Sequence, residues 1–407
     1  MPSLRSKRII TLSLLFVCQG LQILGFGALA LFLPLIRRDF ELTYTQAGGL
    51  FASSTFVYAF MQIPAGYLAD RYGPRRVALA GFAGTALATV TVAVVRDYGM
   101  LLGVMAVYGF FRGLVFTPGL VLLSGWFAPQ RRGTSMGGFI AVVMCFHALL
   151  ALVGPSLVAV IGWRPLFVAI GVIGIGTAVL FERLGSDPPS TEPAAPIGLM
   201  EPLRLFRDRI MWLLGAIQFI RLAVALGIHY WLPTFLVDDA GLSLQSAGVV
   251  IALAAVLAAP SNLLGGYVSD RTARPVLVIC ASLGMLAMTL LLLAMVENLV
   301  LTVAVIAVNA VFLQFYFGPL FAIPVEVLGR RMAGTASGFG NFFANLGSFT
   351  FAFALGAVKD ASGSFAWGFC TLGALAAAGV VLGLLLARER RRIMKHSAVR
   401  SGSARQG

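Results

Sequence analysis

The chain has 407 residues, of which 59% are hydrophobic and only 11% are charged, and its mean hydropathy is +0.92. Soluble domains average about 45–50% apolar and about 25% charged residues, so this composition excludes a water-soluble globular fold. It also excludes a disordered chain, because disorder requires low hydrophobicity. A polytopic membrane protein is the class that remains.

The net charge of +14 and the four cysteines exclude further kinds of site. The basic residues form short clusters between long apolar runs, a distribution that orients membrane helices and does not form a stripe that binds nucleic acid. The cysteines lie singly inside apolar runs, without metal-ligand spacing. We therefore expect no nucleic acid partner, no disulfide, no metal and no cofactor.

Twelve apolar stretches are long enough to cross a bilayer. A hydrocarbon core of about 30 Å requires about 20 residues of helix, whereas barrel strands would alternate over about ten residues, a pattern that is not seen here. The first stretch is too long for a signal peptide, so we expect it to remain attached as helix 1. In chain order the predicted spans are 9–36, 45–69, 75–95, 99–125, 132–158, 163–184, 209–236, 244–268, 275–295, 298–325, 332–358 and 364–387.

The basic residues predict which side of the membrane each connection faces. If both termini lie on one side, 23 of the 30 Lys and Arg residues fall on that side and 5 fall on the other. The remaining two lie inside the spans. Cytoplasmic connections carry the excess of basic residues in membrane proteins. We therefore expect a multi-pass protein of the inner (plasma) membrane, a monomer with both termini in the cytoplasm.

A polar, proline-rich stretch divides the predicted helices into two equal sets. It covers 186–208 and is predicted to be a cytoplasmic linker. The predicted domains are an N-terminal six-helix bundle (1–185), a C-terminal six-helix bundle (209–390) and a basic cytoplasmic tail (391–407). The predicted fold class is therefore an all-α membrane protein with twelve transmembrane helices in two six-helix bundles.

The two halves repeat one another. The segment 42–48 (LTYTQAG) matches 242–248 (LSLQSAG), and 65–71 (AGYLADR) matches 265–271 (GGYVSDR). A duplicated helical unit is typical of alternating-access transporters, whose halves rock about a site near the membrane midplane. The repeat therefore indicates a transporter.

The segment 66–76 (GYLADRYGPRR) resembles the loop signature between helices 2 and 3 of the major facilitator superfamily, and the plan of twelve helices covers almost the whole chain. A weaker copy of the signature lies at 266–271, and the segment 126–137 is similar to the organic-anion branches of the superfamily. The resemblance implies the major facilitator fold, with a central cavity lined by helices 1, 4, 7 and 10.

The same loops contain the predicted gates. Asp70 lies beside arginines with which it can form a charge-assisted cluster, present in one state of the transport cycle and broken in the other. It can also face the positive N-terminus of a neighbouring helix. The alternative is that the arginines only orient the loops. The gating candidates are Asp70, Arg71, Arg75, Arg76, Asp270 and Arg271.

Two arginines, Arg112 and Arg221, lie near the middle of their predicted spans. A central arginine costs about 2.5–3.5 kcal/mol to insert and needs a partner. All sixteen acidic residues can be placed outside the helix centres, so an anionic ligand is the simplest partner, and an anion that bridges both arginines would favour closure of the halves. The alternative is a cap on backbone carbonyls or a cation–π contact with Phe110, Phe111, Phe116 or Trp231.

Other polar residues are predicted to lie at a depth in the membrane similar to that of the two arginines. Together with the helices that line the cavity in the resembled family, they define a candidate substrate shell: Gln22, Arg112, Gln218, Arg221, Asn309, Tyr316, Asn341 and Asn345. For a single amide side chain, a hydrogen bond between helices is the alternative. His147 and His229 are candidates for proton coupling because histidine titrates between about pH 5 and 8, although a lone buried histidine is more often a packing residue.

These residues predict a secondary active transporter of a small organic anion, a mono- or dicarboxylate, that alternates access by proton symport or anion exchange. The coupling proton could travel with the substrate or on His147. The alternatives are an efflux pump for hydrophobic compounds, suggested by 31 phenylalanines, and a non-transporting membrane receptor. An enzyme is not expected. The expected partners are the anionic substrate, a coupling proton or counter-anion, and the lipid bilayer.

Overall fold

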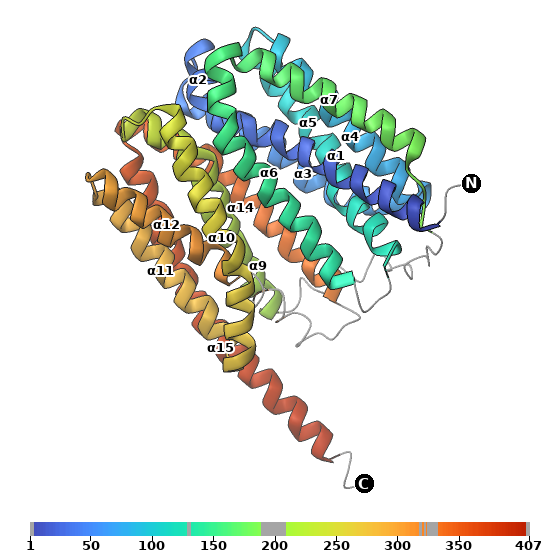
Figure 1. Cartoon of the computed structure of the whole chain (residues 1–407). Helices are drawn as coiled ribbons and strands as arrows, with labels where there is room; N and C mark the ends of the chain where they lie inside the picture. Colours follow the sequence, from blue (N-terminus) through green and yellow to red (C-terminus); the bar gives the residue numbers. More distant parts are fainter. Residues whose placement is uncertain are drawn as a thin grey trace. The chain divides into compact units, whose positions relative to one another are not determined.

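A computed structural model of the chain describes residues 4–127, 132–188, 209–316, 320, 323 and 333–403. Most of the predicted linker (189–208) and the end of the predicted tail (404–407) lie outside these residues. The described residues are almost all helical, and short turns connect the helices (Figure 1). The prediction of an all-α fold is confirmed.

Ten helices within the described ranges are long and apolar enough to cross a membrane. Two more, α3 (Tyr44–Tyr72) and α12 (Leu299–Phe315), occupy the two remaining predicted spans, which agrees with the predicted count of twelve. The ten are α1 (Leu4–Leu31), α4 (Pro74–Val94), α5 (Tyr98–Gly125), α6 (Arg132–Ile161), α7 (Trp163–Leu184), α9 (Arg209–Thr234), α10 (Leu244–Thr272), α11 (Pro275–Met295), α14 (Ala333–Ser362) and α15 (Phe365–Ser403).

Two short segments extend neighbouring helices. The helix α2 (Leu33–Asp39) follows α1, and the π-helical segment η2 (Phe235–Asp239) continues α9. Both end in charged residues, which lie at the polar end of an otherwise apolar stretch.

Capping residues fix where the helices begin. Thr43 accepts a hydrogen bond from the Gln46 backbone N–H, and the Gln46 side chain accepts one in return from the Thr43 backbone, which forms a capping box at the start of α3. The Asp97 side chain caps α5 by accepting a hydrogen bond from the Met100 backbone N–H. Pro74 and Pro275 stand at equivalent places in the repeat and begin α4 and α11, where a missing backbone N–H costs nothing.

The contacts divide the chain into two compact units. Unit 1 consists of Met1–Pro196, Ile228–Val256 and Ala352–Gly363, and unit 2 consists of Ile197–Gly227, Leu257–Phe351 and Ser364–Gly407. Unit 1 therefore contains α1 to α7 together with one end of α9, α10 and α14. These units differ from the two predicted six-helix bundles, 1–185 and 209–390, because parts of α9, α10 and α14 belong to unit 1. The two bundles therefore stay a prediction from the sequence repeat.

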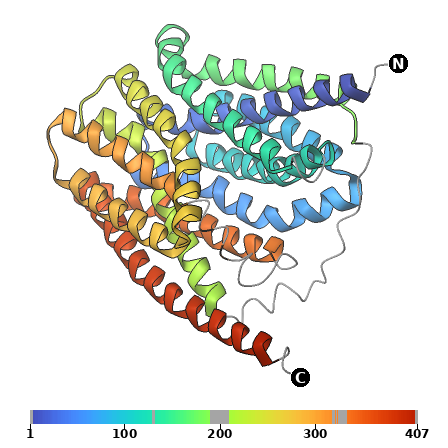
Figure 2. The ribbon, with the colours of Figure 1, turned by 60° about the horizontal axis from the view of Figure 1, so that its bottom comes forward.

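Close helix contacts build each unit. In unit 1, α1 contacts α4, α6 and α7, and both views show α1 beside α7 (Figure 1, Figure 2). A side chain at Gly109 of α5 would lie 2.1 Å from the backbone oxygen of Ser54 on α3, so only glycine allows this approach. In unit 2, α11 packs along α15, and Gly265 of α10 meets the backbone of Phe315 on α12 in the same way as Gly109 meets Ser54.

Candidate substrate site and gates

Arg112 lies between two aromatic rings of unit 1. The carbon at the centre of its guanidinium is 3.8 Å from the ring centre of Phe26 on α1 and 4.4 Å from that of Tyr58 on α3. Among the described residues, Arg112 forms no ion pair with a carboxylate. The alternative of a cation–π contact is therefore present. The two rings, however, belong to α1 and α3 and are not among the four aromatic residues that the sequence suggested.

Gln22 and Tyr108 form a buried polar network one helical turn from this arginine. The Tyr108 hydroxyl donates to the backbone oxygen of Gln22 at 2.6 Å, and the Gln22 amide donates to the same hydroxyl at 3.3 Å. Gln19 donates to the Gln22 side-chain oxygen at 3.4 Å, and the Tyr108 ring stacks against Phe26. Gln22 and Arg112 are thus linked through Tyr108 and Phe26, which the sequence did not single out because one tyrosine in an apolar helix gives no distinct signal.

Arg221 is held by an amide in unit 2. Its Nε donates to the side-chain oxygen of Gln218 at 2.7 Å, and both side chains are buried. Tyr316 is fully buried and lies in electrostatic range of Arg221, and in the described part of the chain its hydroxyl has no hydrogen-bond partner. Gln218 packs against Gly340 of α14, where a Cβ would lie 3.4 Å away. The structure therefore brings together three residues of the predicted substrate shell, Gln218, Arg221 and Tyr316.

The asparagines of the predicted shell bond within the protein. Asn309 on α12 donates to the Thr289 hydroxyl on α11 at 2.8 Å. Asn345 donates to the backbone oxygen of Asn341, one turn earlier on α14, also at 2.8 Å. Asn309 therefore matches the alternative of a hydrogen bond between helices, whereas the Asn345 bond lies within α14. An amide that bonds to the protein is satisfied without a ligand.

His147 and His229 contact one another in unit 1. Their rings are 5.1 Å apart, nearly perpendicular, and join α6 to α9. Beside them is a small cavity of about 20 Å³ whose other walls are apolar. The sequence named both residues but gave no reason to pair them, because 82 residues separate them in the chain. The cavity lining comprises Gly27, Ala30, Leu31, His147, Leu150, Ala151, His229, Pro233 and Ile251.

A cluster of charges ties η2 to the start of α3, and we call this part of unit 1 the Asp238 end. The Asp238 carboxylate accepts hydrogen bonds from Arg37 at 2.9 Å, Arg38 at 3.1 Å and the Tyr44 hydroxyl at 3.1 Å. Its side chain is only 7% exposed. Tyr44 lies just outside the predicted span 45–69, and burial together with the neighbouring Asp238 carboxylate raises the pKa of its phenol to about 12. The phenol therefore keeps its proton and remains a donor.

The end of α14 adds two further contacts there. Asp360 accepts hydrogen bonds from the backbone N–H of Tyr44 at 2.9 Å and from the backbone and hydroxyl of Thr45 at 2.7 and 2.6 Å, so it caps α3 from another helix. Lys359 donates to Asp239 at 2.5 Å. The sequence missed this cluster. The available signal was that opposite charges fall on the same predicted side of the membrane.

Backbone contacts close the same end. Tyr230 and Trp231 of α9 donate to the backbone oxygens of Ala47 and Ala352, at 2.7 and 2.9 Å. A side chain at Gly48 would lie 2.5 Å from the Ala352 oxygen. We call the contact of α3 with α9 and α14 the seam. The seam requires a glycine at position 48 and the buried hydrogen-bond donors Tyr230 and Trp231.

Among the described residues, the charge cluster predicted around Asp70, at the other end of α3, is not formed. Within the described residues Asp70 makes no ion pair with the arginines beside it, and its side chain is exposed. Arg71 and Arg271 instead donate to the tyrosine one turn earlier, at 3.1 and 2.9 Å, and Arg75 donates to backbone oxygens of Phe181 and Glu182 on α7. Exposed charges gain little from pairing, which explains why the cluster is not formed. The exposed members are Asp70, Arg71, Arg76, Asp270 and Arg271.

The family model of the Major Facilitator Superfamily matches residues 15–352. The chain belongs to this superfamily. It is 28% identical over 392 residues to the hexuronate transporter of Bacillus subtilis, and the match covers 89% of this chain and 90% of the relative. It is 25% identical to a probable sulfoacetate transporter of Cupriavidus necator, with 87% of each covered.

A solved structure has the same fold. A bacterial homolog of the human lysosomal transporter Spinster, in an inward-facing and occupied conformation, superposes with a TM-score of 0.77, with 97% of this chain and 98% of the other covered at 17% identity. The superfamily and the fold make this chain a multi-pass transport protein and not an enzyme.

Proposed function

We propose that the chain is a secondary active transporter of a small organic anion, a mono- or dicarboxylate, that works by alternating access. One observation carries the proposal: Arg112 is held among aromatic rings and forms no ion pair in the described part of the chain. A half-buried guanidinium near the middle of a membrane helix, without a carboxylate, favours an anionic ligand as its partner. Two relatives named for organic acids, hexuronate and sulfoacetate, support the same class.

The surroundings of Arg112 suit carboxylate binding. The rings of Phe26 and Tyr58 lie against the guanidinium face. Because the N–H groups of a guanidinium lie in its plane, such contacts fix the group while its edge can donate two parallel hydrogen bonds to a carboxylate. In unit 2, Gln218 fixes the orientation of Arg221 through Nε, so the other nitrogens of that guanidinium can likewise donate to an anion.

Hydroxyl groups on the substrate are a further feature that the shell fits. The Tyr316 hydroxyl is buried and has no partner among the described residues. A buried hydroxyl without a partner is costly, and a polar ligand would remove that cost. We therefore propose hydroxy acids and sulfonates of the size of a hexuronate as the first compounds to examine.

The energy source in our proposal is proton symport or anion exchange. A proton can travel with the acid itself or on a histidine, and imidazole is the side chain that titrates between about pH 5 and 8. The contact between His147 and His229 supports a role in symport, since it joins two helices that come from different halves of the repeat.

The two ends of α3 supply the gates. We propose that the seam at the Asp238 end closes one side of the membrane, while the residues around Asp70 form the gate on the other side when the protein changes state. The excess of basic residues supports a cytoplasmic location for the Asp70 end and for both termini. The protein is proposed to act as a monomer in the inner (plasma) membrane.

Uptake into proteoliposomes tests the proposal. Labelled glucuronate, galactonate and sulfoacetate would be presented with and without an inward proton gradient. We expect at least one of them to accumulate, and we expect Arg112→Gln to lower its uptake by at least about 30-fold, the effect of losing a charge-assisted hydrogen bond. Arg96→Gln, which removes an exposed arginine between α4 and α5, is the matched control.

The outcomes separate the alternatives. Stimulation by the gradient that His147→Gln abolishes supports symport through the histidine pair, whereas stimulation by unlabelled anion inside the vesicles supports exchange. Unchanged uptake of every anion in Arg112→Gln would remove the site assignment. Transport of hydrophobic dyes without any anion uptake would replace the proposal with efflux.

A further inference from the structure

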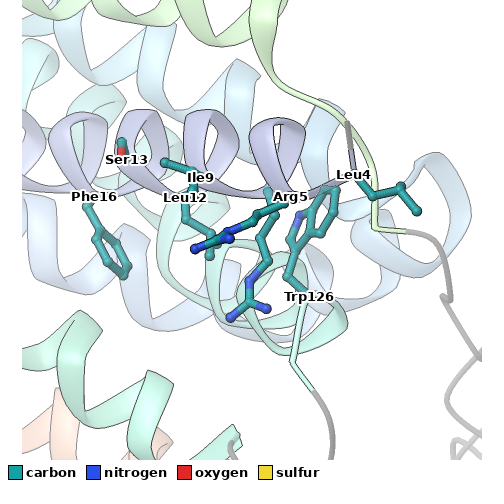
Figure 3. A pocket seen from close by; sticks show the side chains of 8 residues that line it. Leu4, Arg5, Ile9, Leu12, Ser13, Phe16 and Trp126 are labelled. Carbon is teal, nitrogen blue, oxygen red and sulfur yellow. The ribbon is translucent and has the colours of Figure 1, made fainter. Parts of the chain in front are cut away.

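A groove lies along the first turns of α1, at the Asp70 end of unit 1. It has a volume of about 600 Å³ and is formed by α1 and the residue that follows α5. Figure 3 shows Leu4 and Phe16 at opposite ends of the groove and Trp126 between them. It is separate from the Arg112 and Arg221 sites, with which it shares no residue. The groove is lined by Leu4, Arg5, Arg8, Ile9, Leu12, Ser13, Phe16 and Trp126.

Two positive charges lie on one face of α1 in this groove. Arg5 and Arg8 are three residues apart, a spacing at which helical side chains are neighbours and like charges repel. No carboxylate among the described residues forms an ion pair with either of them. The guanidinium of Arg8 lies 4.2 Å from the ring centre of Phe127, which fixes its position. A negative group between the two arginines would offset their repulsion.

Trp126 adds a third donor. Its side chain is 8% exposed and lines the groove, and its indole N–H has no acceptor in the described part of the chain. A buried indole N–H nearly always finds a partner. The groove is therefore lined by two guanidinium groups and by an indole N–H that has no acceptor among the described residues.

The remaining lining is apolar and partly open. Leu4 and Ile9 are exposed although both are large and hydrophobic, and Leu12 and Phe16 continue the same helix face. A soluble sugar acid has no apolar portion to cover these side chains. A phospholipid has both parts, an anionic phosphate and acyl chains.

We propose that this groove binds the phosphate headgroup of an anionic phospholipid. Arg5, Arg8 and the Trp126 N–H would bind the phosphate oxygens, and the first carbons of the acyl chains would lie on Leu4, Ile9 and Phe16. Basic pockets on the cytoplasmic side of membrane proteins bind anionic headgroups, and tryptophan is enriched at that depth. The lipid would anchor the start of α1 at the membrane surface.

Lipid binding to the purified full-length chain in neutral detergent tests the proposal. Native mass spectrometry would count bound phosphatidylglycerol and, separately, phosphatidylcholine, and the thermal midpoint would be measured with each lipid, with inorganic phosphate and with glycerol 1-phosphate. We expect tight retention of phosphatidylglycerol and little response to the other three compounds. In the double variant Arg5→Gln/Arg8→Gln we expect the affinity for phosphatidylglycerol to fall about 30-fold. This is the expected effect of removing one contact with the phosphate at each of the two arginines.

Matched variants keep the test specific. Arg388→Gln/Arg391→Gln removes two exposed arginines at the same three-residue spacing on α15 and should change phosphatidylglycerol affinity by less than about twofold. Trp126→Phe keeps the ring and removes the N–H, and should weaken binding by about fivefold. Equal retention of phosphatidylcholine, an equal shift with free phosphate, or unchanged lipid binding in the Arg5/Arg8 variant would each overturn the proposal.

Discussion

The Asp238 end and the Asp70 end of unit 1 are joined by the same helix, α3, but their charged residues are arranged in opposite ways. At the Asp238 end, Arg37, Tyr44 and Asp360 are bonded across helices that are far apart in the sequence. At the Asp70 end, Asp70 and Arg76 are exposed, and among the described residues Arg71 bonds to Tyr67 of its own helix. A transporter that opens one side at a time requires such a difference.

The exposure of the charged side chains decides how much each arrangement contributes to the stability of the closed state. The Asp238 side chain is 7% exposed and that of Arg37 is 20% exposed, whereas Arg38 is 62% exposed. Removing one partner of a buried pair leaves an uncompensated charge, while an exposed pair contributes about 0–1 kcal/mol. We therefore expect the Arg37 contact to hold the seam and the Arg38 contact to add little.

The largest expected effect comes from Gly48→Val. The new Cβ would lie 2.5 Å from the Ala352 backbone oxygen, which cannot move aside as a flexible side chain would. Overpacking costs about 1–3 kcal/mol, so we expect roughly a 5- to 150-fold shift away from the closed seam. A cysteine probe at Ala47→Cys would report it as faster maleimide labelling, after serine replaces the native Cys18, Cys145, Cys280 and Cys370.

Gly103→Val on α5 is the control for this experiment, because nothing lies within 4 Å of a Cβ there. If both valine variants label the probe equally fast, the close approach at Gly48 does not control closure.

Asp238→Asn is expected to have the next largest effect. The amide keeps the shape but leaves Arg37 and Arg38 side by side without a negative partner. We expect labelling of the probe at Ala47→Cys to accelerate about tenfold, which corresponds to about 1.4 kcal/mol. Glu297→Gln, an exposed acid outside the cluster, should leave the rate unchanged. A rate for Asp238→Asn equal to that of the parent would show that the seam closes without its ion pairs.

Asp360→Ala should have a smaller effect that separates closure from stability. The variant removes a cap worth about 1 kcal/mol, so we expect a lower thermal midpoint and roughly fivefold faster labelling. Asp97→Ala is matched, because Asp97 caps α5 and does not join the seam. It should lower the midpoint by a similar amount without faster labelling. The same labelling rate in both would mean that Asp360 only stabilises α3.

Asp70→Asn should have the smallest effect on stability. Because the carboxylate is exposed and makes no ion pair among the described residues, we expect the free energy of unfolding to change by less than about 0.5 kcal/mol. Its proposed gate role would appear as slower uptake with unchanged substrate affinity. A loss of thermal stability as large as that of Asp238→Asn would contradict the contrast between the two ends.

Much of the fold could be predicted from local properties of the chain. Hydropathy located the spans, and the repeated prolines Pro74 and Pro275 stand where equivalent helices begin. The absence of carboxylates from the span centres singled out Arg112 as a cation without an acidic partner, and its cation–π contact agrees with the stated alternative in kind. The rings that hold it, Phe26 and Tyr58, could not be chosen from the sequence because they lie on other helices.

The sequence by itself determined the helical architecture and the positions of Arg112 and Arg221 near the middle of their helices, because hydropathy and charge act along one helix at a time. Only the tertiary structure decided which side chains meet. Arg37 and Asp238 are 201 residues apart, and His147 lies against a histidine from another helix. Such pairs depend on which helix faces come together in the folded protein, and that packing follows from the shapes of all the neighbouring helices at once.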